Sequence, residues 1–555
     1  MLRAHQKQMN EVISQIISGN IDVDTILLKA TPGAGKSAIP PLASKLINAG
    51  LADALLWVCP RKSLQDQGER NFLDPFFRRL LGHTATVRAA TNDVDPCRGH
   101  FGAITTYQAI GVDEAGTVLN DFRKKRYILV LDEFHHCEKD GTWAKAIAPL
   151  VELAAFKIFM TGTIQRGDDS QIAFIEYAAH VYDGWVPAMY GSKTRAVIEY
   201  SRTDALQERA IIPLQFHLHD GVSEWEDEEG RTRRESLGNV MEMDAGAAIY
   251  TALATEYANE LLEMALSHWV NRRYDFPGSK LLVVTASIEH ATAAAEYLSR
   301  KLHRHAIATS HDPAQAQEMI KQFKSDRLDI LVTISMAYEG LDVPAISHVA
   351  CLTHIRSTPW IDQMLGRAVR VDSRFPYETQ TGFIFAPDDP FFRKIVKAIQ
   401  AEQLPIAKAA SEKIEIGSGK QRDLFGEERE YDNIYKITPI GSRLTGRREL
   451  PLGGQAGLFA SAASMQQQLI KTPSEVESEL RETIDSHVRQ FAFANRFNPK
   501  KINTEIKNSF HGKPREEMTV EELDQVYKHL LQHYPLSKVR GTGIPRCSTR
   551  AVAWP

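Results

Sequence analysis

Residues 30–37 read ATPGAGKS and directly follow the apolar run TILLK at residues 25–29. An apolar run, a glycine-rich loop and a helical pattern in this order are typical of a strand, a phosphate-binding loop and a helix. In such a loop the backbone N–H groups surround phosphates, Lys36 reaches the β and γ oxygens, and Ser37 binds Mg²⁺. The stretch therefore predicts an α/β domain that binds a nucleoside triphosphate. The loop residues expected to contact it are Thr31, Gly33, Ala34, Gly35, Lys36 and Ser37.

The composition is that of a globular protein with several domains. The chain has 555 residues, of which 43% are hydrophobic and 25% charged, and its formal net charge is -4. A chain of this length divides into about three or four domains. Because the net charge is slightly negative, any nucleic-acid contact is expected to come from a local groove. Scattered cysteines, the polar start and the lack of long apolar runs favour a cytoplasmic protein without membrane contact.

Two segments alternate short apolar runs with helical patterns. In residues 1–165 the runs include ALLWVCP and YILVLDE, and in residues 279–405 they include KLLVVTAS and LDILVTIS. Continuous apolar runs separated by helices indicate parallel sheets that are covered on both faces. The predicted fold class is therefore α/β, with two parallel-sheet lobes in tandem.

Three further segments have different compositions. Residues 166–278 are expected to form an inserted or connecting segment, with an exposed hairpin or loop at residues 220–236 and one long helix at residues 247–273. Residues 406–471 are polar and rich in glycine, which is typical of a linker. Residues 472–555 become helical again, and we expect a mostly helical accessory module there.

Two carboxylates follow an apolar run. The run YILVL ends in Asp132 and Glu133. At the end of a strand one carboxylate can hold Mg²⁺ while its neighbour orients an attacking water. A metal cluster of His135, His136 and Cys137 is disfavoured, because adjacent residues of one segment rarely converge on a single ion.

A pair of arginines lies in the second alternating segment. In QMLGRAVR, Arg367 and Arg370 are three residues apart, so both project from one face of a predicted helix. Such a pair on its own is most often a solvated face. Within a second lobe that closes over the first, both side chains can approach the γ-phosphate.

In chain order these segments resemble the motifs of superfamily 2 helicases over nearly all of residues 1–400. LRAHQ is similar to their adenine-reading segment, ATPGAGKS to motif I, VCPRKSLQDQ to motif Ia and ITTYQAI to the next nucleic-acid segment. DEFH is the DExH form of motif II, while TGT, VVTAS, AYEGLDVP and QMLGRAVR resemble motifs III to VI. Ala30 departs from the general loop pattern, as it often does in these helicases. Residues 336–370 resemble the branch related to type III restriction subunits, which mostly acts on DNA.

The resemblance implies two RecA-like lobes that hydrolyse ATP with Mg²⁺. It implies that Glu133 is the catalytic base, that Asp132 and Ser37 hold Mg²⁺, and that Arg367 and Arg370 sense the γ-phosphate. Further implied contacts are those of Gln6 with the base, of Gly340 and Asp342 with the nucleotide, and of Arg61, Gln67, Thr106 and Thr285 with the nucleic-acid backbone.

The expected function is an ATP-dependent DNA helicase or translocase on single-stranded or forked DNA. Its two lobes would open and close in each ATP cycle and step along a strand bound across both. An RNA helicase is an alternative. Others are the motor subunit of a restriction or phage-defence complex with a separate nuclease, and a nucleotide-switched protein that clamps nucleic acid without unwinding it.

A peptide in the predicted linker, QRDLF at residues 421–425, resembles the short motif that binds the bacterial sliding clamp. Recognition of this kind needs a glutamine in a polar pocket and a Leu-Phe pair in an apolar cleft. It would favour bacterial or phage DNA metabolism. The alternative is that the apolar pair pins the linker against a lobe. The residues concerned are Gln421, Asp423, Leu424 and Phe425.

The last segment carries a helix start and a local excess of positive charge. Thr519 is a predicted N-cap and Glu522 follows three residues later. The basic residues indicate an accessory DNA-binding or partner module, or simply a solvated helical face. They are Lys500, Lys501, Lys507, Lys513 and Arg515.

Overall fold

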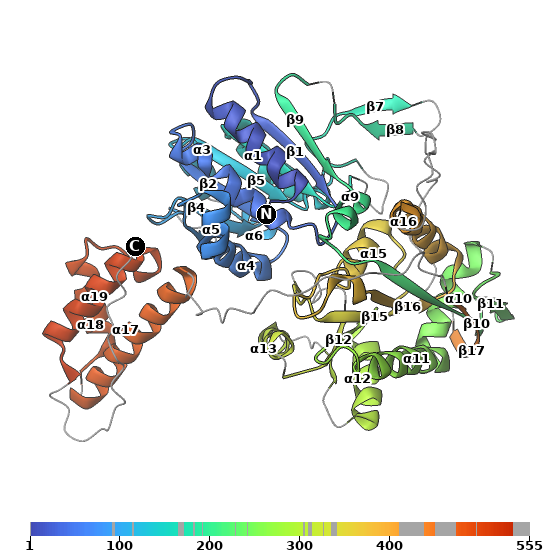
Figure 1. Cartoon of the computed structure of the whole chain (residues 1–555). Helices are drawn as coiled ribbons and strands as arrows, with labels where there is room; N and C mark the ends of the chain where they lie inside the picture. The colour runs from blue at the N-terminus through green and yellow to red at the C-terminus, as the bar shows by residue number, and fades with distance from the viewer. Residues whose placement is uncertain are drawn as a thin grey trace.

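The computed structural model places two α/β lobes and a helical module along the chain (Figure 1). The residues that it describes are 2–90, 95–113, 116–164, 171–180, 184–190, 192–227, 229–240, 242–302, 306–308, 313–325, 327–334, 341–409, 438–449, 473–495 and 497–536.

Lobe 1 is built on a parallel sheet. Seven strands of the described residues form it in the order β3-β4-β2-β5-β6-β1-β9, and every neighbouring pair is parallel. Strand β2 is buried along its whole length, which explains its uninterrupted apolar run. Because the strands are parallel, their carboxyl ends meet at one edge. The strands are β1 (Thr25–Ala30), β2 (Ala54–Cys59), β3 (Val87–Ala89), β4 (Gly102–Thr106), β5 (Tyr127–Asp132), β6 (Phe156–Thr161) and β9 (Arg195–Tyr200).

Helices cover this sheet, and a small antiparallel pair, β7 (Tyr177–His180) and β8 (Gly184–Pro187), lies outside it. The helix α9 (Arg202–Gln207) follows β9 and packs against lobe 2. The other helices are α1 (Ala4–Ile17), η1 (Lys36–Ala38), α2 (Ile39–Ala43), α3 (Lys45–Asn48), α4 (Lys62–Leu73), α5 (Pro75–Leu81), α6 (Tyr107–Gly111), α7 (Thr117–Phe122), η2 (Phe134–His136) and α8 (Thr142–Leu153).

Lobe 2 contains a second, mostly parallel sheet. In the described residues its order is β11-β10-β16-β15-β12-β14-β13, and an eighth strand, β17, pairs with β10. Only β11 and β17 run antiparallel to their neighbour. The predicted α/β class with two parallel-sheet lobes is therefore confirmed. The strands are β10 (Leu214–Glu226), β11 (Thr232–Ser236), β12 (Lys280–Thr285), β13 (Ala306–Ala308), β14 (Ile330–Ile334), β15 (Ile346–Leu352), β16 (Gly382–Pro387) and β17 (Thr438–Glu449).

The long helix expected at residues 247–273 is divided in two. Thr255 has extended backbone angles, and its hydroxyl donates to the carbonyl of Thr251. Ser442 of β17 then accepts the N–H of Tyr257, so a distant strand caps the second helix. The helices of lobe 2 are α10 (Glu242–Ala254), α11 (Glu256–Arg272), α12 (Ile288–Lys301), α13 (Pro313–Lys324), α15 (Thr358–Leu365), η3 (Tyr377–Thr379) and α16 (Pro390–Ala409).

The sheets cut across two boundaries expected from the sequence. Within residues 166–278, β9 is an edge strand of lobe 1 and β10 belongs to lobe 2. Within the expected linker at residues 406–471, β17 is part of the second sheet. Its polar sequence does not predict a strand, because the strand is held by backbone hydrogen bonds to β10. The stretch expected to be an exposed hairpin or loop at residues 220–236 is a hairpin, because β10 and β11 pair antiparallel, with Glu226 opposite Thr232. Its first strand is not exposed, since Trp225 is only 2% exposed.

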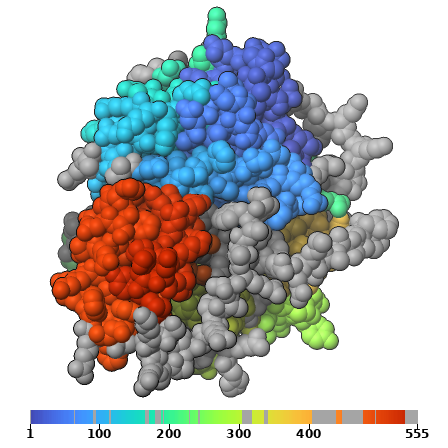
Figure 2. Space-filling view, turned by 90° about the vertical axis from the view of Figure 1, so that its left-hand side faces the viewer, coloured from blue at the N-terminus to red at the C-terminus, as the bar shows by residue number. Residues whose placement is uncertain are grey.

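The helical module has its own apolar core, which includes Ile484, Ile502 and Leu523. The predicted capping box is confirmed: the Thr519 hydroxyl accepts the N–H of Glu522, whose carboxylate accepts the N–H of Thr519. The module lies beside lobe 1 (Figures 1 and 2). Its helices are α17 (Pro473–Asn495), α18 (Pro499–Ser509), η5 (Arg515–Glu517) and α19 (Val520–His533).

A buried ion-pair cluster fixes the module to lobe 1. Glu477 of α17 accepts hydrogen bonds from Arg88 of β3 at 3.0 and 3.3 Å and also pairs with Arg98. Only 6–7% of each of these three side chains is exposed. The carboxylate also pairs with Arg481, one turn later in α17. The four residues are called the Glu477 cluster below.

Other expectations concern thiols and membranes. In the described parts of the chain the cysteines are free and buried. Among the same residues no helix is both long and apolar enough to cross a bilayer.

Candidate active site

The phosphate loop follows the carboxyl end of β1. Gly33 and Gly35 have φ angles of +84° and +82°, a left-handed backbone that glycine adopts without strain. The helical turn η1 begins directly at Lys36. The glycine spacing read from the sequence therefore produces the turn that aims backbone N–H groups and Lys36 at one point.

The N-terminal segment packs against the loop. The Gln6 side-chain amide donates to the Gly35 carbonyl at 3.2 Å, and its oxygen accepts the N–H of Arg3 at 3.0 Å. Arg3 also donates to the Gly33 carbonyl at 3.2 Å. Gln6, expected to contact the base, is thus placed beside the loop. The role of Arg3 had no signal in the sequence, because a single arginine near the start of a chain matches no pattern.

Asp132 at the end of β5 and Glu133 directly after it line the same pocket as the loop. Glu133 forms an ion pair with Lys36. The second oxygen of Glu133 accepts the backbone N–H of Gly162 at 3.1 Å and lies 3.4 Å from the hydroxyl of Thr161, the threonine that ends β6. Glu133 itself has a φ angle of +48°. Its carboxylate is therefore held between β1 and β6 by a strained backbone and three neighbours.

The two carboxylates differ in acidity. Burial, and then the charge of Glu133, raises the pKa of Asp132 to about 7. Burial also acts to raise the pKa of Glu133, but the charge of Lys36 and the contact with His135 outweigh it and hold that pKa well below its ordinary value. Glu133 is therefore the ionised member of the pair, and Asp132 gains from any cation brought near it.

The alternative of a metal cluster at residues 135–137 gets no support. The Nδ1 atom of His135 lies 2.8 Å from the hydroxyl of Thr161, with which it shares a hydrogen bond. Within the described ranges no group of three or more His, Cys, Asp or Glu side chains is arranged to hold a metal ion. His135 instead supports the wall behind Glu133.

Lobe 2 closes the site from the other side. One pocket, called the interlobe pocket here, is lined by both lobes. From lobe 1 come Pro32, Gly33, Gly35, Lys36, Ser37, Trp57, Pro60, Leu64, Gln67, Asn71, Asp132, Glu133 and His136, and from lobe 2 come Asp342, Gln363, Gly366, Arg367 and Arg370.

Polar contacts join the two walls of this pocket. The Gln67 amide of lobe 1 donates to Asp342 of lobe 2 at 3.2 Å. Asp342 also lies 3.5 Å from Nε of Arg370, and Arg367 donates to the Leu341 carbonyl at 3.1 Å. Gln67, expected on the nucleic-acid path, therefore lies in the pocket in this structure. Both arginines line the same pocket as the phosphate loop. They do not lie on the predicted helix, because α15 ends at Leu365 and both follow it. Their contact with the γ-phosphate stays a prediction.

The lobes approach each other closely at Gly366. A Cβ atom added there would lie 2.6 Å from Cβ of Pro32 in the phosphate loop. Similarly, a Cβ atom on Gly33 would lie 2.9 Å from Cγ2 of Val369. These glycines allow the loop and the arginine-bearing segment to touch.

We expect Gly366→Ala to slow ATP hydrolysis about ten- to hundred-fold, because overpacking at this contact costs about 1–3 kcal/mol of closure. Nucleotide affinity and turnover would be measured together. Gly446→Ala is a matched control, since a Cβ atom there meets Asp220 at 3.6 Å, an ordinary contact. Equal turnover in the two variants would contradict a requirement for this closed contact.

The remaining expected nucleic-acid residues lie at strand ends outside the pocket. The hydroxyl of Thr106 accepts the N–H of Ala109 and caps α6. Thr285 is fully buried, and its hydroxyl lies 3.2 Å from the carbonyl of Ser287. Arg61 precedes α4. In this conformation the two threonine hydroxyls are used within the fold, so their predicted nucleic-acid contacts stay predictions.

Other expected residues fall elsewhere. Thr31 donates its backbone N–H to the Tyr200 carbonyl, and Ala34 is fully buried, so both support the loop from behind. Gly340 and the peptide at residues 421–425 lie outside the described residues.

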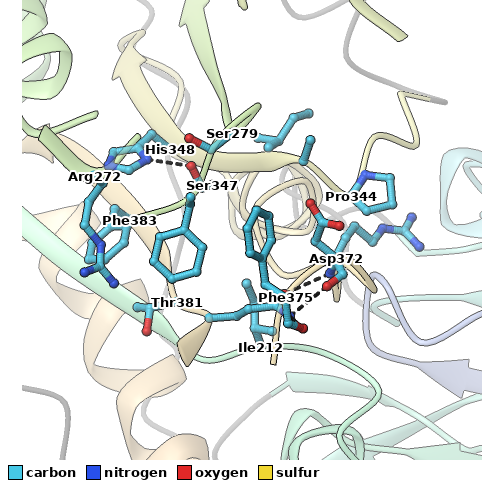
Figure 3. A pocket seen from close by; sticks show the side chains of 15 residues that line it. Ile212, Arg272, Ser279, Pro344, Ser347, His348, Asp372, Phe375, Thr381 and Phe383 are labelled. Carbon is cyan, nitrogen blue, oxygen red and sulfur yellow. Dashed lines mark hydrogen bonds between the residues drawn. The ribbon is translucent and has the colours of Figure 1, made fainter. Parts of the chain in front are cut away.

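A second pocket lies within lobe 2 (Figure 3). Phenyl rings form much of its wall, and Ser347 shares a 2.8 Å hydrogen bond with His348. It contains no part of the phosphate loop and is therefore not the nucleotide site. Its lining residues are Ile212, Arg272, Phe276, Ser279, Pro344, Ala345, Ile346, Ser347, His348, Arg370, Asp372, Phe375, Gln380, Thr381 and Phe383.

Fold and pocket together define a two-lobed α/β protein with a phosphate-binding loop at the junction of its lobes. Residues 1–166 match the family model described as type III restriction enzyme, res subunit, and residues 265–372 match the helicase conserved C-terminal domain. Two segments of the chain thus match domains of superfamily 2 helicases, and the first of them matches the branch related to type III restriction subunits. Its helicase domains imply the use of ATP.

Similar proteins match parts of the chain. An uncharacterized protein of Mycobacterium leprae is 25% identical over 390 residues, which are 68% of this chain and 61% of that protein. UvrABC system protein B of Xylella fastidiosa (strain M12) is 33% identical over 99 residues, 17% of this chain and 15% of that protein. The chain thus spans about three fifths of the Mycobacterium leprae relative.

Solved structures show partial similarity. The Mycobacterium smegmatis helicase Lhr, bound to ssDNA and AMP-PNP, aligns with a TM-score of 0.44 at 15% identity over 71% of this chain and 48% of that chain. The type ISP restriction-modification enzyme LlaBIII, bound to DNA, aligns with a TM-score of 0.46 at 14% identity over 96% of this chain and 38% of that chain. At this similarity the alignments say nothing about the substrate of this chain.

Proposed function

We propose that this protein is an ATP-dependent DNA helicase or translocase. The observation that carries the proposal is the interlobe pocket, in which Lys36 and Glu133 of lobe 1 face Arg367 and Arg370 of lobe 2. Neither lobe holds all four groups. Hydrolysis would therefore require closure, and each closure would move any strand bound across both lobes.

The ion pair between Lys36 and Glu133 would be the state of the site before ATP binds. When ATP enters, the phosphates attract Lys36, which releases one oxygen of Glu133. The N–H of Gly162 still holds the other oxygen. Glu133 is then an oriented base that can accept a proton from the attacking water, while the arginines stabilise the charge on the transferred phosphoryl group.

The donor groups fit Mg²⁺. Ser37 and Asp132 both line the pocket, and the raised pKa of Asp132 shows a carboxylate that lacks enough compensating charge. Mg²⁺ usually takes one or two protein oxygens and completes its shell with water and phosphate oxygens. Bound there, it would neutralise charge on the nucleotide phosphates.

The choice of DNA rests on the branch that residues 1–166 match. An RNA helicase is the alternative for the polymer, and the motor subunit of a restriction or defence complex with a separate nuclease is the alternative for the assembly. Binding of the sliding clamp through Leu424 and Phe425 stays a prediction, as does the cytoplasmic location. Lobe closure would move the protein along DNA or RNA in the same way, so an experiment has to choose between the two polymers.

The test is ATP hydrolysis by the full chain alone, with single-stranded DNA, with duplex DNA and with RNA. We expect DNA to stimulate turnover, and Glu133→Gln to lower it about 10²- to 10⁴-fold. Stimulation by RNA alone would reverse the choice of polymer. Lack of stimulation by any polymer would favour a motor that needs a partner subunit. Strand displacement that depends on ATP would separate a motor from a protein that only clamps.

A further inference from the structure

Two exposed phenylalanines flank the turn between α17 and α18 in the helical module. Phe493 near the end of α17 is 90% exposed, and Phe497 in the turn before α18 is 49% exposed. Arg489 lies one helical turn before Phe493, on the same face. Lys500 and Lys501 follow in the first turn of α18 and are exposed. These five residues are called the aromatic-basic patch.

The patch carries a concentrated positive charge. Residues 486–504 contain Arg489, Arg496, Lys500 and Lys501 and no aspartate or glutamate, although the chain as a whole has a net charge of -4. Among the residues that the structure describes, the lysines form no ion pair within 4.0 Å. The charge is therefore available to a ligand and not used to stabilise the module.

The two kinds of side chain in the patch define its ligand. Lysine and arginine attract phosphates, and an exposed phenyl ring offers a face on which a base can stack. In a duplex the faces of the bases are already stacked on one another, so only a single strand can use the rings. An acidic peptide would satisfy the cations but would leave the ring faces without a matching partner.

We propose that the aromatic-basic patch binds single-stranded nucleic acid and forms an accessory contact for the strand on which the motor acts. The proposal rests on the proposed function for the identity of that strand. The Glu477 cluster fixes α17 on lobe 1 at one end. With a rise of about 1.5 Å per residue, Phe493 lies about 24 Å along the helix from Glu477. The patch is thus held on a rigid arm at a set distance from lobe 1.

The test is binding of fluorescently labelled oligothymidylate to the full chain without nucleotide, followed by anisotropy over a range of salt concentrations. Phe493→Ala with Phe497→Ala is expected to raise Kd at least about tenfold and to leave the salt dependence unchanged, because stacking involves no counterions. Lys500→Ala with Lys501→Ala is expected to lower the slope of log K against log salt by about 1.4.

Leu531→Ala is the control, because Leu531 is an exposed apolar residue of the same module, 47% exposed, in α19. Unchanged binding in both double variants would overturn the proposal. A second outcome would also overturn it: the phenylalanine variant loses self-association, measured by sedimentation, but binds DNA as before. The patch would then be covered by a second copy of the chain and not by DNA. Stimulation of ATP hydrolysis by DNA is measured in parallel. If it persists in every variant, the proposed function stands whatever the patch binds.

Discussion

Alanine in place of Arg367 or Arg370 is expected to lower kcat for ATP hydrolysis about 10³-fold, with a much smaller effect on ATP binding. Both guanidinium groups belong to lobe 2 and line the pocket that holds Lys36 and Glu133. They would touch the γ-phosphate only after closure, so their charge acts mainly on the transition state. Turnover under saturating ATP and nucleotide binding would be measured on the same preparations.

Two substitutions sharpen this test. Arg374→Ala removes a nearby arginine that pairs with Asp372 at 2.7 Å, is 44% exposed and lies outside the interlobe pocket, so it should leave kcat unchanged. Arg370→Lys keeps the charge but loses the planar fork, and is expected to recover only part of the rate. Normal turnover in both Arg367→Ala and Arg370→Ala would mean that hydrolysis does not depend on lobe 2.

Lysine in place of Glu477 is expected to detach the helical module from lobe 1. The change leaves Arg88, Arg98 and Arg481 without their carboxylate and adds a fourth cation to the cluster. Removal of one partner from a buried ion pair costs about 3–5 kcal/mol, and reversal of its charge costs more. Because the module has its own core, we expect it to stay folded. Hydrogen exchange should therefore rise in β3 and at the start of α17, while α19 stays protected.

Glu482→Lys makes the same charge change on the exposed face of α17, outside the cluster, and is expected to leave the exchange of β3 unchanged. Protection of β3 at the wild-type level in Glu477→Lys would show that apolar contacts alone hold the module. Detachment should also weaken the binding of a single strand that contacts both the patch and the motor. The two sites would then no longer lie at a fixed distance from each other.

Local features of the chain could be predicted from the sequence because their physical causes are local. The left-handed turns of Gly33 and Gly35, the N-cap at Thr519 and the buried strand β2 each depend on a few neighbouring residues. The order of the helicase motifs extended the prediction from these local features to both lobes. The fold class and part of each wall of the interlobe pocket could therefore be predicted from the sequence.

Strand β17 shows where this reasoning fails. Its sequence is polar and contains two glycines, Gly441 and Gly446, so it is similar to a linker. It becomes a strand through backbone hydrogen bonds to β10, which no side-chain pattern reveals. The break at Thr255 has the same origin, because Ser442 of that strand caps α11.

The sequence by itself determined that the chain has two α/β lobes and a phosphate-binding loop, because the loop and the buried strands are encoded by adjacent residues. Only the tertiary structure decided how the parts meet. Gln67 and Asp342 are 275 positions apart, and Arg88 and Glu477 are 389 apart. No pattern in the sequence indicates that the two members of either pair contact each other. Folding brings them into partly or fully buried contact, where a charge or an amide needs a specific partner.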